Sequence, residues 1–186
     1  MDVLSKILSS TRTVVTTQWL ALNDSERDRN SLSRSLMYYA KKGVLLNPRK
    51  GIYTKLKYDE QEMACTILSP SYISLEYVLA RAGVTFQYSS EITCVGYQNR
   101  TIEVDGRSYV FRKINPMLWA NMLGIEQQDN IAIATPERAF LDMLYLSAGQ
   151  CYFDNLHPLN KDLIRQILPN YNSKALTKRV EALLKE

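Results

Sequence analysis

Residues 29–54 constrain the fold of this chain more than any other stretch. Their apolar side chains recur with the 3.6-residue period of a helix and form one buried stripe: Leu32, Leu36, Tyr39 and Ala40. Gly43 follows at the position where helices commonly end. Residues 47–51, Asn-Pro-Arg-Lys-Gly, favour a turn and separate two short apolar runs, 44–46 and 52–54. The stretch therefore predicts a helix followed by a hairpin with two basic residues at its tip.

The opposite side of the predicted helix is polar and basic. It carries Asn30, Arg34, Met37, Tyr38 and Lys41. A helix with such a face, followed by a basic hairpin, is the layout of a winged helix-turn-helix, which places its recognition helix in the major groove of DNA. This layout therefore predicts a protein that binds DNA.

The residues before this helix fit the same fold. A polar connection is expected over residues 23–28, and Asp28 or Asn30 is expected to cap the third helix. Upstream of the connection the sequence predicts a helix over residues 2–9, a strand at 14–15 that pairs with the hairpin, and a helix capped by Thr16 or Thr17.

The charge is concentrated at the N-terminal end. Residues 1–58 hold 11 Lys and Arg against 4 Asp and Glu, a net charge of +7, whereas the rest of the chain holds 12 against 15, a net charge of −3. This asymmetry indicates a domain that binds a polyanion. The charge alone fits an ordinary solvated surface equally well. The coincidence with a basic helix and a basic hairpin favours DNA.

The composition argues against several other classes of protein. Cys65, Cys94 and Cys151 lie far apart and form no CxxC pair, so neither a disulfide framework nor a zinc site is expected. His157 is the only histidine, which argues against a His-rich metal site. No apolar run approaches the roughly 20 residues of a membrane span, and the chain opens into an amphipathic helix instead of a leader. We expect a cytoplasmic protein without a cofactor or a bound metal.

The length and the charge pattern predict two domains. The chain has 186 residues, 46% of them hydrophobic, which is enough for two small cores. We place the boundary at residue 58, where the charge balance changes: a winged helix-turn-helix over residues 1–58 and a second domain over residues 59–186. The second domain is expected to combine helices with a small antiparallel sheet, so the fold class of the whole chain is α+β.

The elements of the second domain can be located from turn and cap signals. Strands are expected at 91–96, 101–104 and 108–114, with Asp105-Gly106 as a hairpin turn, and at 131–134. Helices are expected over 59–68, over 75–82 after a Ser74 cap, from Pro136 after a Thr135 cap, over 161–168 and over 173–185.

Three short stretches of the sequence are informative because of the order and spacing in which they occur. The first is 49–53, Arg-Lys-Gly-Ile-Tyr. The second is 70–76, Pro-Ser-Tyr-Ile-Ser-Leu-Glu, with its helix running to Gly83. The third is 134–142, Ala-Thr-Pro-Glu-Arg-Ala-Phe-Leu-Asp. In this order and spacing they resemble the AbiEi-type antitoxins, and the resemblance extends over nearly the whole chain.

This resemblance implies a function. AbiEi-type proteins are described as transcriptional regulators of viral defence (abortive infection) systems. Their N-terminal winged helix represses their own operon, and their C-terminal domain supplies antitoxin activity. The implied partners are double-stranded operator DNA and a nucleotidyltransferase-like toxin encoded next door, in a type IV toxin-antitoxin pair. Direct contact between antitoxin and toxin is left open.

The expected DNA contacts lie on the third helix and the hairpin. Arg34 can offer a bidentate fork to guanine O6 and N7, and Asn30 can pair with adenine, where the helix enters the major groove. The lysines and the hairpin arginine are better placed to contact phosphates. The full set is Arg29, Asn30, Ser33, Arg34, Tyr38, Lys41, Lys42, Arg49 and Lys50. A domain that binds protein through the same face is one alternative.

A nucleic-acid-processing enzyme is the other alternative. Glu137, Arg138 and Asp142 stand near a helix start, where an acidic residue offsets the helix dipole without any substrate. Glu103 and Asp105 suit a metal-dependent nuclease or a nucleotidyl transferase, since neighbouring carboxylates hold Mg²⁺ in such enzymes. No lysine follows them at strand spacing, and turn or edge positions explain them better. Because no Gly-rich phosphate loop, GxSxG or HExxH occurs, no catalytic residue is assigned and we expect no enzyme activity.

Overall fold

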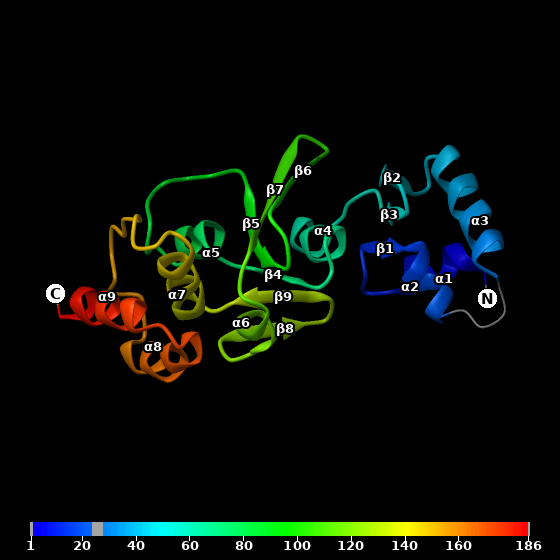
Figure 1. Ribbon diagram of the computed structural model, residues 1–186. Coiled ribbons are helices and arrows are strands. Elements are labelled where there is room, and N and C mark those ends of the chain that lie inside the picture. The colour runs from blue at the N-terminus through cyan, green and yellow to red at the C-terminus, as the bar shows by residue number, and fades with distance from the viewer. Residues whose placement is uncertain (1, 24–27, 186) are drawn as a thin grey trace. The chain divides into compact units, whose positions relative to one another are not determined.

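The chain is an α+β protein with two sheets, as predicted. The computed structural model describes residues 2–23 and 28–185 (Figure 1). They fall into two units: the first holds the residues up to Ser69 together with Val104–Gly106, and the second holds Pro70–Glu103 and the residues from Arg107 onward. None of the described helices has the length and apolar composition that a membrane crossing requires.

Three helices and a three-stranded antiparallel sheet form most of the first unit. The helices are α1 (Val3–Ser9), α2 (Thr17–Asn23) and α3 (Arg29–Lys41). The strands are β1 (Val14–Thr16), β2 (Leu46–Arg49) and β3 (Ile52–Thr54), in the order β1-β3-β2. β1 pairs with the hairpin strand β3, which confirms that prediction. The elements share one core: Val3, Ile7, Val15, Leu20, Leu32, Leu36, Leu45 and Tyr53.

Helix α3 begins as the sequence predicts. The Asp28 carboxylate accepts a hydrogen bond from the Ser31 N–H at 2.6 Å and so satisfies one of the N–H groups that a helix start leaves unpaired. Leu32 and Leu36 are fully buried on the predicted stripe. Residues 24–27, most of the predicted polar connection, lie outside the described residues.

The same helix ends at a glycine. Gly43 has φ +70°, in the left-handed region that glycine adopts without a Cβ clash. Its N–H donates to the Ala40 carbonyl at 3.0 Å, and the Val44 N–H donates to the Tyr39 carbonyl at 3.0 Å. This pair of bonds is a Schellman motif, which satisfies carbonyls at the helix end and turns the chain toward β2.

Helix α4 (Glu60–Ile67) belongs to the first unit, whereas the boundary at residue 58 assigned it to the second domain. Its Glu62 is buried, and Oε2 accepts hydrogen bonds from the N–H and the hydroxyl of Thr13 at 2.8 and 2.6 Å. The predicted boundary rested on charge, which does not reveal that an acidic side chain anchors a helix. With α4 included, residues 1–69 carry a net charge of +4.

The second unit contains a six-stranded sheet in the order β6-β7-β5-β4-β9-β8, apart from Val104 at the end of β6, which belongs to the first unit. Its strands are β4 (Ser71–Ile73), β5 (Ile92–Gly96), β6 (Arg100–Val104), β7 (Arg107–Lys113), β8 (Ile125–Gln128) and β9 (Ile131–Ala134). The predicted small antiparallel sheet is wrong in this respect, because β4 pairs with β9 and β5 pairs with β7 in parallel. β4 and β8 were not predicted. Parallel strands are not joined directly by a tight turn, so turn signals in the sequence do not reveal which strands pair in this way.

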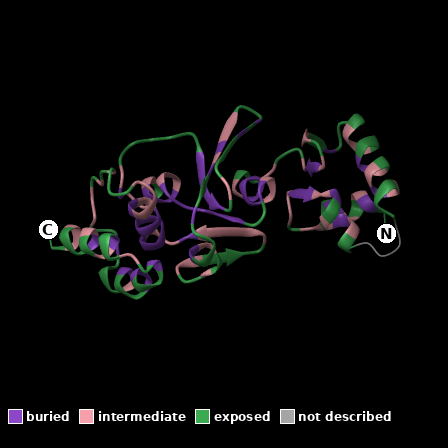
Figure 2. Ribbon diagram, in the orientation of Figure 1, coloured by how far each residue is buried: buried purple, intermediate pink, exposed green. Residues whose placement is uncertain are grey.

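Helices complete the second unit. They are α5 (Glu76–Arg81), α6 (Pro116–Ala120), α7 (Pro136–Leu146), α8 (Lys161–Ile167) with a 3₁₀ turn (Leu168–Tyr171), and α9 (Lys174–Leu184). Figure 2 shows β4, β5 and most of α7 buried, and α8 and α9 largely exposed. Thr135 caps α7 as predicted. Ser74 does not cap α5: Leu75 precedes that helix with φ +62°, and no side chain caps it.

Candidate functional site

Helix α3 presents two stripes of side chains outside its buried face. Arg29, Asn30 and Ser33 lie on one stripe, and Arg34 and Tyr38 lie on the other. With 3.6 residues per turn, the centres of the two stripes are separated by about a third of a turn. The predicted contact residues of this helix therefore divide between two directions.

The hairpin that follows α3 turns tightly. β2 runs to Arg49, so the turn holds only Lys50 and Gly51, whereas the sequence predicted a turn over residues 47–51. The Asn47 side-chain amide donates to two carbonyl oxygens of the hairpin at 2.9 and 2.7 Å, beside a bulge in the β2–β3 register. This amide makes two local bonds that turn propensities do not anticipate, and β2 accommodates Pro48 because it is an edge strand.

The first stripe of α3 and the hairpin border an open hollow of about 690 Å³, which we call the α3–hairpin hollow. Five predicted contact residues line it: Arg29, Asn30, Ser33, Arg49 and Lys50. Three of them are cations and two offer an amide and a hydroxyl. Among the described residues that line the hollow, none carries a carboxylate.

Sequence reasoning missed the far wall of this hollow. Thr16, Thr17 and Gln18, at the start of α2, line it as well. The Thr17 N–H donates to the Gly51 carbonyl at 3.2 Å and so joins the start of α2 to the hairpin turn. The available signal was the predicted pairing of β1 with the hairpin, since the residues after β1 must then lie beside the turn.

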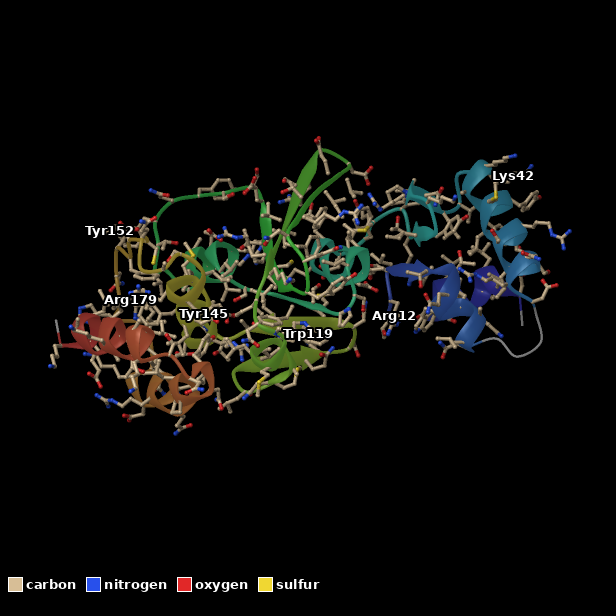
Figure 3. All side chains as sticks on the ribbon, viewed as in Figure 1. Arg12, Lys42, Trp119, Tyr145, Tyr152 and Arg179 are labelled. Carbon is tan, nitrogen blue, oxygen red and sulfur yellow. The ribbon has the colours of Figure 1, made fainter. Side chains whose placement is uncertain are left out.

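The other predicted contact residues lie outside the hollow. Arg34, Lys41 and Lys42 are exposed, and Tyr38 is 56% exposed. Lys42, at the end of α3 (Figure 3), holds its ammonium 5.7 Å from the centre of the Tyr38 ring. These four residues form a second basic surface on α3.

A buried polar network in the second unit contains two of the residues that suggested an enzyme. The Arg138 and Asp142 side chains are 1% and 0% exposed, and Nε lies 3.1 Å from Oδ1. Asp142 also accepts hydrogen bonds from the hydroxyls of Tyr72, Ser74 and Tyr171 at 2.9, 2.9 and 2.6 Å. Four donors therefore meet this carboxylate, which matches the roughly four acceptor positions that a carboxylate has.

The guanidinium of Arg138 is equally well satisfied. Besides Asp142, it donates to the Tyr72 hydroxyl at 2.9 Å and to the carbonyls of Leu118, Asn121 and Leu123 at 2.8, 2.9 and 3.0 Å. All five N–H groups have partners. A catalytic acid or base must reach the proton that it transfers, and this network leaves no position for a substrate. It holds the segment around α6 against α7.

The ionisation of the network follows from its burial. Burial raises the pKa of the Tyr72 and Tyr171 hydroxyls, and the neighbouring Asp142 charge adds to the shift. Both phenols therefore stay protonated and donate to Asp142. Burial opposes the charged form of Arg138, but the attraction of Asp142 together with smaller contributions from Tyr171 and Tyr72 outweighs it, so the Arg138 pKa is raised overall.

The remaining acidic candidates are dispersed. Glu137 is 6% exposed, and its Oε1 accepts the Asn160 N–H at 2.9 Å. Glu103 and Asp105 are exposed, and Asp105 has φ +51° in the turn after β6. Within residues 2–23 and 28–185, no three His, Cys, Asp or Glu side chains gather in a way that would hold a metal ion.

The network joins two of the three stretches on which the resemblance to AbiEi-type antitoxins rests. Tyr72 and Ser74 come from the second stretch, and Arg138 and Asp142 from the third. No protein-family model and no curated protein matches this chain. The resemblance therefore stays a prediction.

Proposed function

We propose that the first unit is a winged helix-turn-helix that binds double-stranded DNA, with α3 as the recognition helix and the β2–β3 hairpin as the wing. The observation that carries this proposal is the α3–hairpin hollow. Five predicted contact residues from α3 and the hairpin share it, and no described lining residue is acidic. A cationic surface with amide and hydroxyl groups suits both the phosphates and the base edges of DNA.

The lining residues divide by chemistry into two roles. Asn30 can make the bidentate contact to adenine that an amide side chain allows, and Ser33 can bond to several base edges. Arg29, Arg49 and Lys50 contact phosphates and fix the orientation of the protein on the duplex. Arg34, on the outer stripe of α3, is the candidate for guanine.

We further propose that the chain represses its own operon and acts as the antitoxin of a type IV toxin-antitoxin pair. The resemblance to AbiEi-type proteins supports this role. The buried network adds support, because two of the motifs behind the resemblance meet in it through Tyr72, Ser74, Arg138 and Asp142. The antitoxin activity is assigned to the second unit, and its target is a nucleotidyltransferase-like toxin.

The DNA-binding proposal is tested by titrating the full chain against the DNA upstream of its gene at several salt concentrations. If only the three cations of the hollow bind phosphates, log K falls with log[salt] with a slope of about −2.7; if Lys41 and Lys42 also do so, the slope is about −4.5. The slope thus tells whether the lysines at the end of α3 bind phosphates in addition to the cations of the hollow. Binding that is independent of salt, or equal on unrelated DNA, contradicts the proposal.

Single substitutions separate the two roles. Asn30→Ala should cost about 1 to 3 kcal/mol on the operator and relax specificity at one base pair. Lys50→Ala should weaken binding to all sequences alike and reduce the magnitude of the salt slope by about 0.9. Lys57→Ala is the matched control, because Lys57 is an exposed lysine of the same unit outside the hollow.

The antitoxin proposal requires a separate assay. Cells that express the neighbouring nucleotidyltransferase-like gene should stop growing, and co-expression of this chain should restore growth. Asn30→Ala together with Lys50→Ala should abolish repression of the promoter and leave this protection intact. If the folded double variant loses both activities, the division of labour between the units is wrong.

A further inference from the structure

A groove runs along α9 in the second unit. It measures about 710 Å³, and Leu168, Pro169 and Leu184 contribute apolar side chains to it. A smaller hollow of about 350 Å³ shares Leu168 and Pro169 with it and extends the groove to Lys174, at the start of α9. We call the two together the α9 groove. Its larger part lies within the roughly 300 to 1,000 Å³ of ordinary ligand sites.

The groove exists because α9 buries only part of its apolar stripe. Leu176 and Val180 are each 1% exposed and attach the helix to the unit. Leu184 continues the same stripe one turn later, but it is only half-buried and faces the groove. An amphipathic helix whose apolar stripe continues past its buried part leaves an apolar surface open to a second element.

Cations surround this apolar floor. Lys174, Lys178 and Lys185 are exposed lining residues, and Glu181 is the one acidic side chain among the described residues that line the groove. Arg165 also lines it and pairs with Asp162 at 3.0 Å. An apolar floor with a cationic rim complements a ligand that is apolar on one side and acidic on the other.

We propose that the α9 groove binds an acidic amphipathic helix of a partner protein, with apolar side chains against Leu184 and Pro169 and carboxylates against the lysines. This is the helix-in-groove mode of recognition, in which residues spaced three and four apart provide the anchors. The surface is separate from the α3–hairpin hollow and does not rest on DNA binding.

Two other occupants fit the groove less well. Single-stranded nucleic acid stacks its bases on aromatic side chains, and none of the described lining residues is aromatic. A second copy of the chain in a two-fold dimer through this face would bring two copies of the same cationic rim together, because a two-fold interface uses the same surface patch on both subunits. Like charges directed at each other oppose such a dimer.

The probe for this surface is a synthetic peptide of about 18 residues, five helical turns, with leucines on one face and glutamates elsewhere. Its binding to the full chain is followed by fluorescence anisotropy. Lys174→Glu with Lys178→Glu should weaken binding at least about tenfold, and raising the salt should weaken it as well. Leu184→Asp should weaken it similarly by placing a charge on the apolar floor.

The controls distinguish a loss of peptide binding at the groove from a general effect of charge or a loss of fold. Lys113→Glu reverses the charge of an exposed lysine on β7, outside the groove, and should leave the affinity unchanged. A peptide of the same composition, scrambled so that its leucines no longer share one face, should bind at least about tenfold more weakly. Circular dichroism of each variant establishes that it is folded. The proposal is overturned if the peptide does not bind or if the scrambled peptide binds equally well. It is also overturned if the chain forms a dimer that Leu184→Asp dissociates.

Discussion

The buried pair Arg138–Asp142 and the exposed pair Arg165–Asp162 provide a direct test of what holds the second unit together. Their closest nitrogen and oxygen atoms are almost equally far apart, at 3.1 and 3.0 Å. Their exposure differs completely: the first two side chains are 1% and 0% exposed, and the second two are 65% and 83% exposed. A comparison of the two pairs therefore separates burial from distance.

Arg138→Met removes a guanidinium and leaves its partners buried. Asp142 loses its only cationic partner in the network, and the carbonyls of Leu118, Asn121 and Leu123 lose their donor. Breaking a buried pair costs about 3 to 5 kcal/mol, a large part of the roughly 5 to 15 kcal/mol that stabilises a domain. Arg165→Met breaks an exposed pair and should cost about 0 to 1 kcal/mol.

Urea unfolding can be followed in each unit separately, because the chain has two tryptophans, Trp19 on α2 and Trp119 on α6. In a Trp19→Phe background, the fluorescence of Trp119 (Figure 3) reports the second unit. Trp119 follows Leu118 in the chain, and the Leu118 carbonyl accepts a hydrogen bond from Arg138. The midpoint should fall steeply for Arg138→Met and hardly at all for Arg165→Met. If the two substitutions cost the same, within about 1 kcal/mol, burial does not control the strength of these pairs.

Three further results are expected. The purified chain with Mg²⁺ or Mn²⁺ should leave DNA, RNA and nucleotides unchanged, and turnover that Glu137→Gln abolishes would favour the enzyme alternative. The melting temperature should fall as the pH rises above about 10, because tyrosines ionise near pKa 10.0 in the unfolded chain while burial keeps Tyr72 and Tyr171 protonated in the folded one. This stabilisation is complete below that pH, and a Tyr72→Phe variant should show a weaker decline. A chain cut after residue 69 should keep the helices and the three-stranded sheet of its first unit, whereas a cut after residue 58 removes the Glu62 acceptor of Thr13 and should cost about 1 to 3 kcal/mol in urea unfolding.

Local signals predicted much of the fold. Asp28 and Thr135 cap helices because their side chains reach an N–H three residues later, and Gly43 ends α3 because its own backbone permits a positive φ. The hairpin also followed from nearby residues, although its turn is shorter than predicted. Each of these features depends on a few consecutive residues, which is why sequence patterns found them.

Long-range partners could not be found in this way. β4 has three buried residues and no alternation, and it forms only because β5 and β9 pair with it from elsewhere in the chain. Ser74 resembles a helix cap, but its hydroxyl donates to Asp142, 68 residues away. In the α3–hairpin hollow, the residues of α3 and the hairpin were predicted from charge and periodicity, whereas Gln18 was missed because only the pairing of β1 brings it there.

The late position of Tyr171 has a consequence for synthesis on the ribosome. The first unit draws mainly on residues up to Ser69, so its core is complete in the nascent chain early. The second unit cannot close its network until Tyr171 emerges to donate to Asp142. At about 5 to 20 residues per second, the intervening chain takes roughly 5 to 20 seconds to make. In the last part of that interval, after Asp142 has been made, its carboxylate still lacks the Tyr171 donor. A nascent chain with a finished N-terminal unit and an unfinished C-terminal one is therefore a normal stage in the life of this protein.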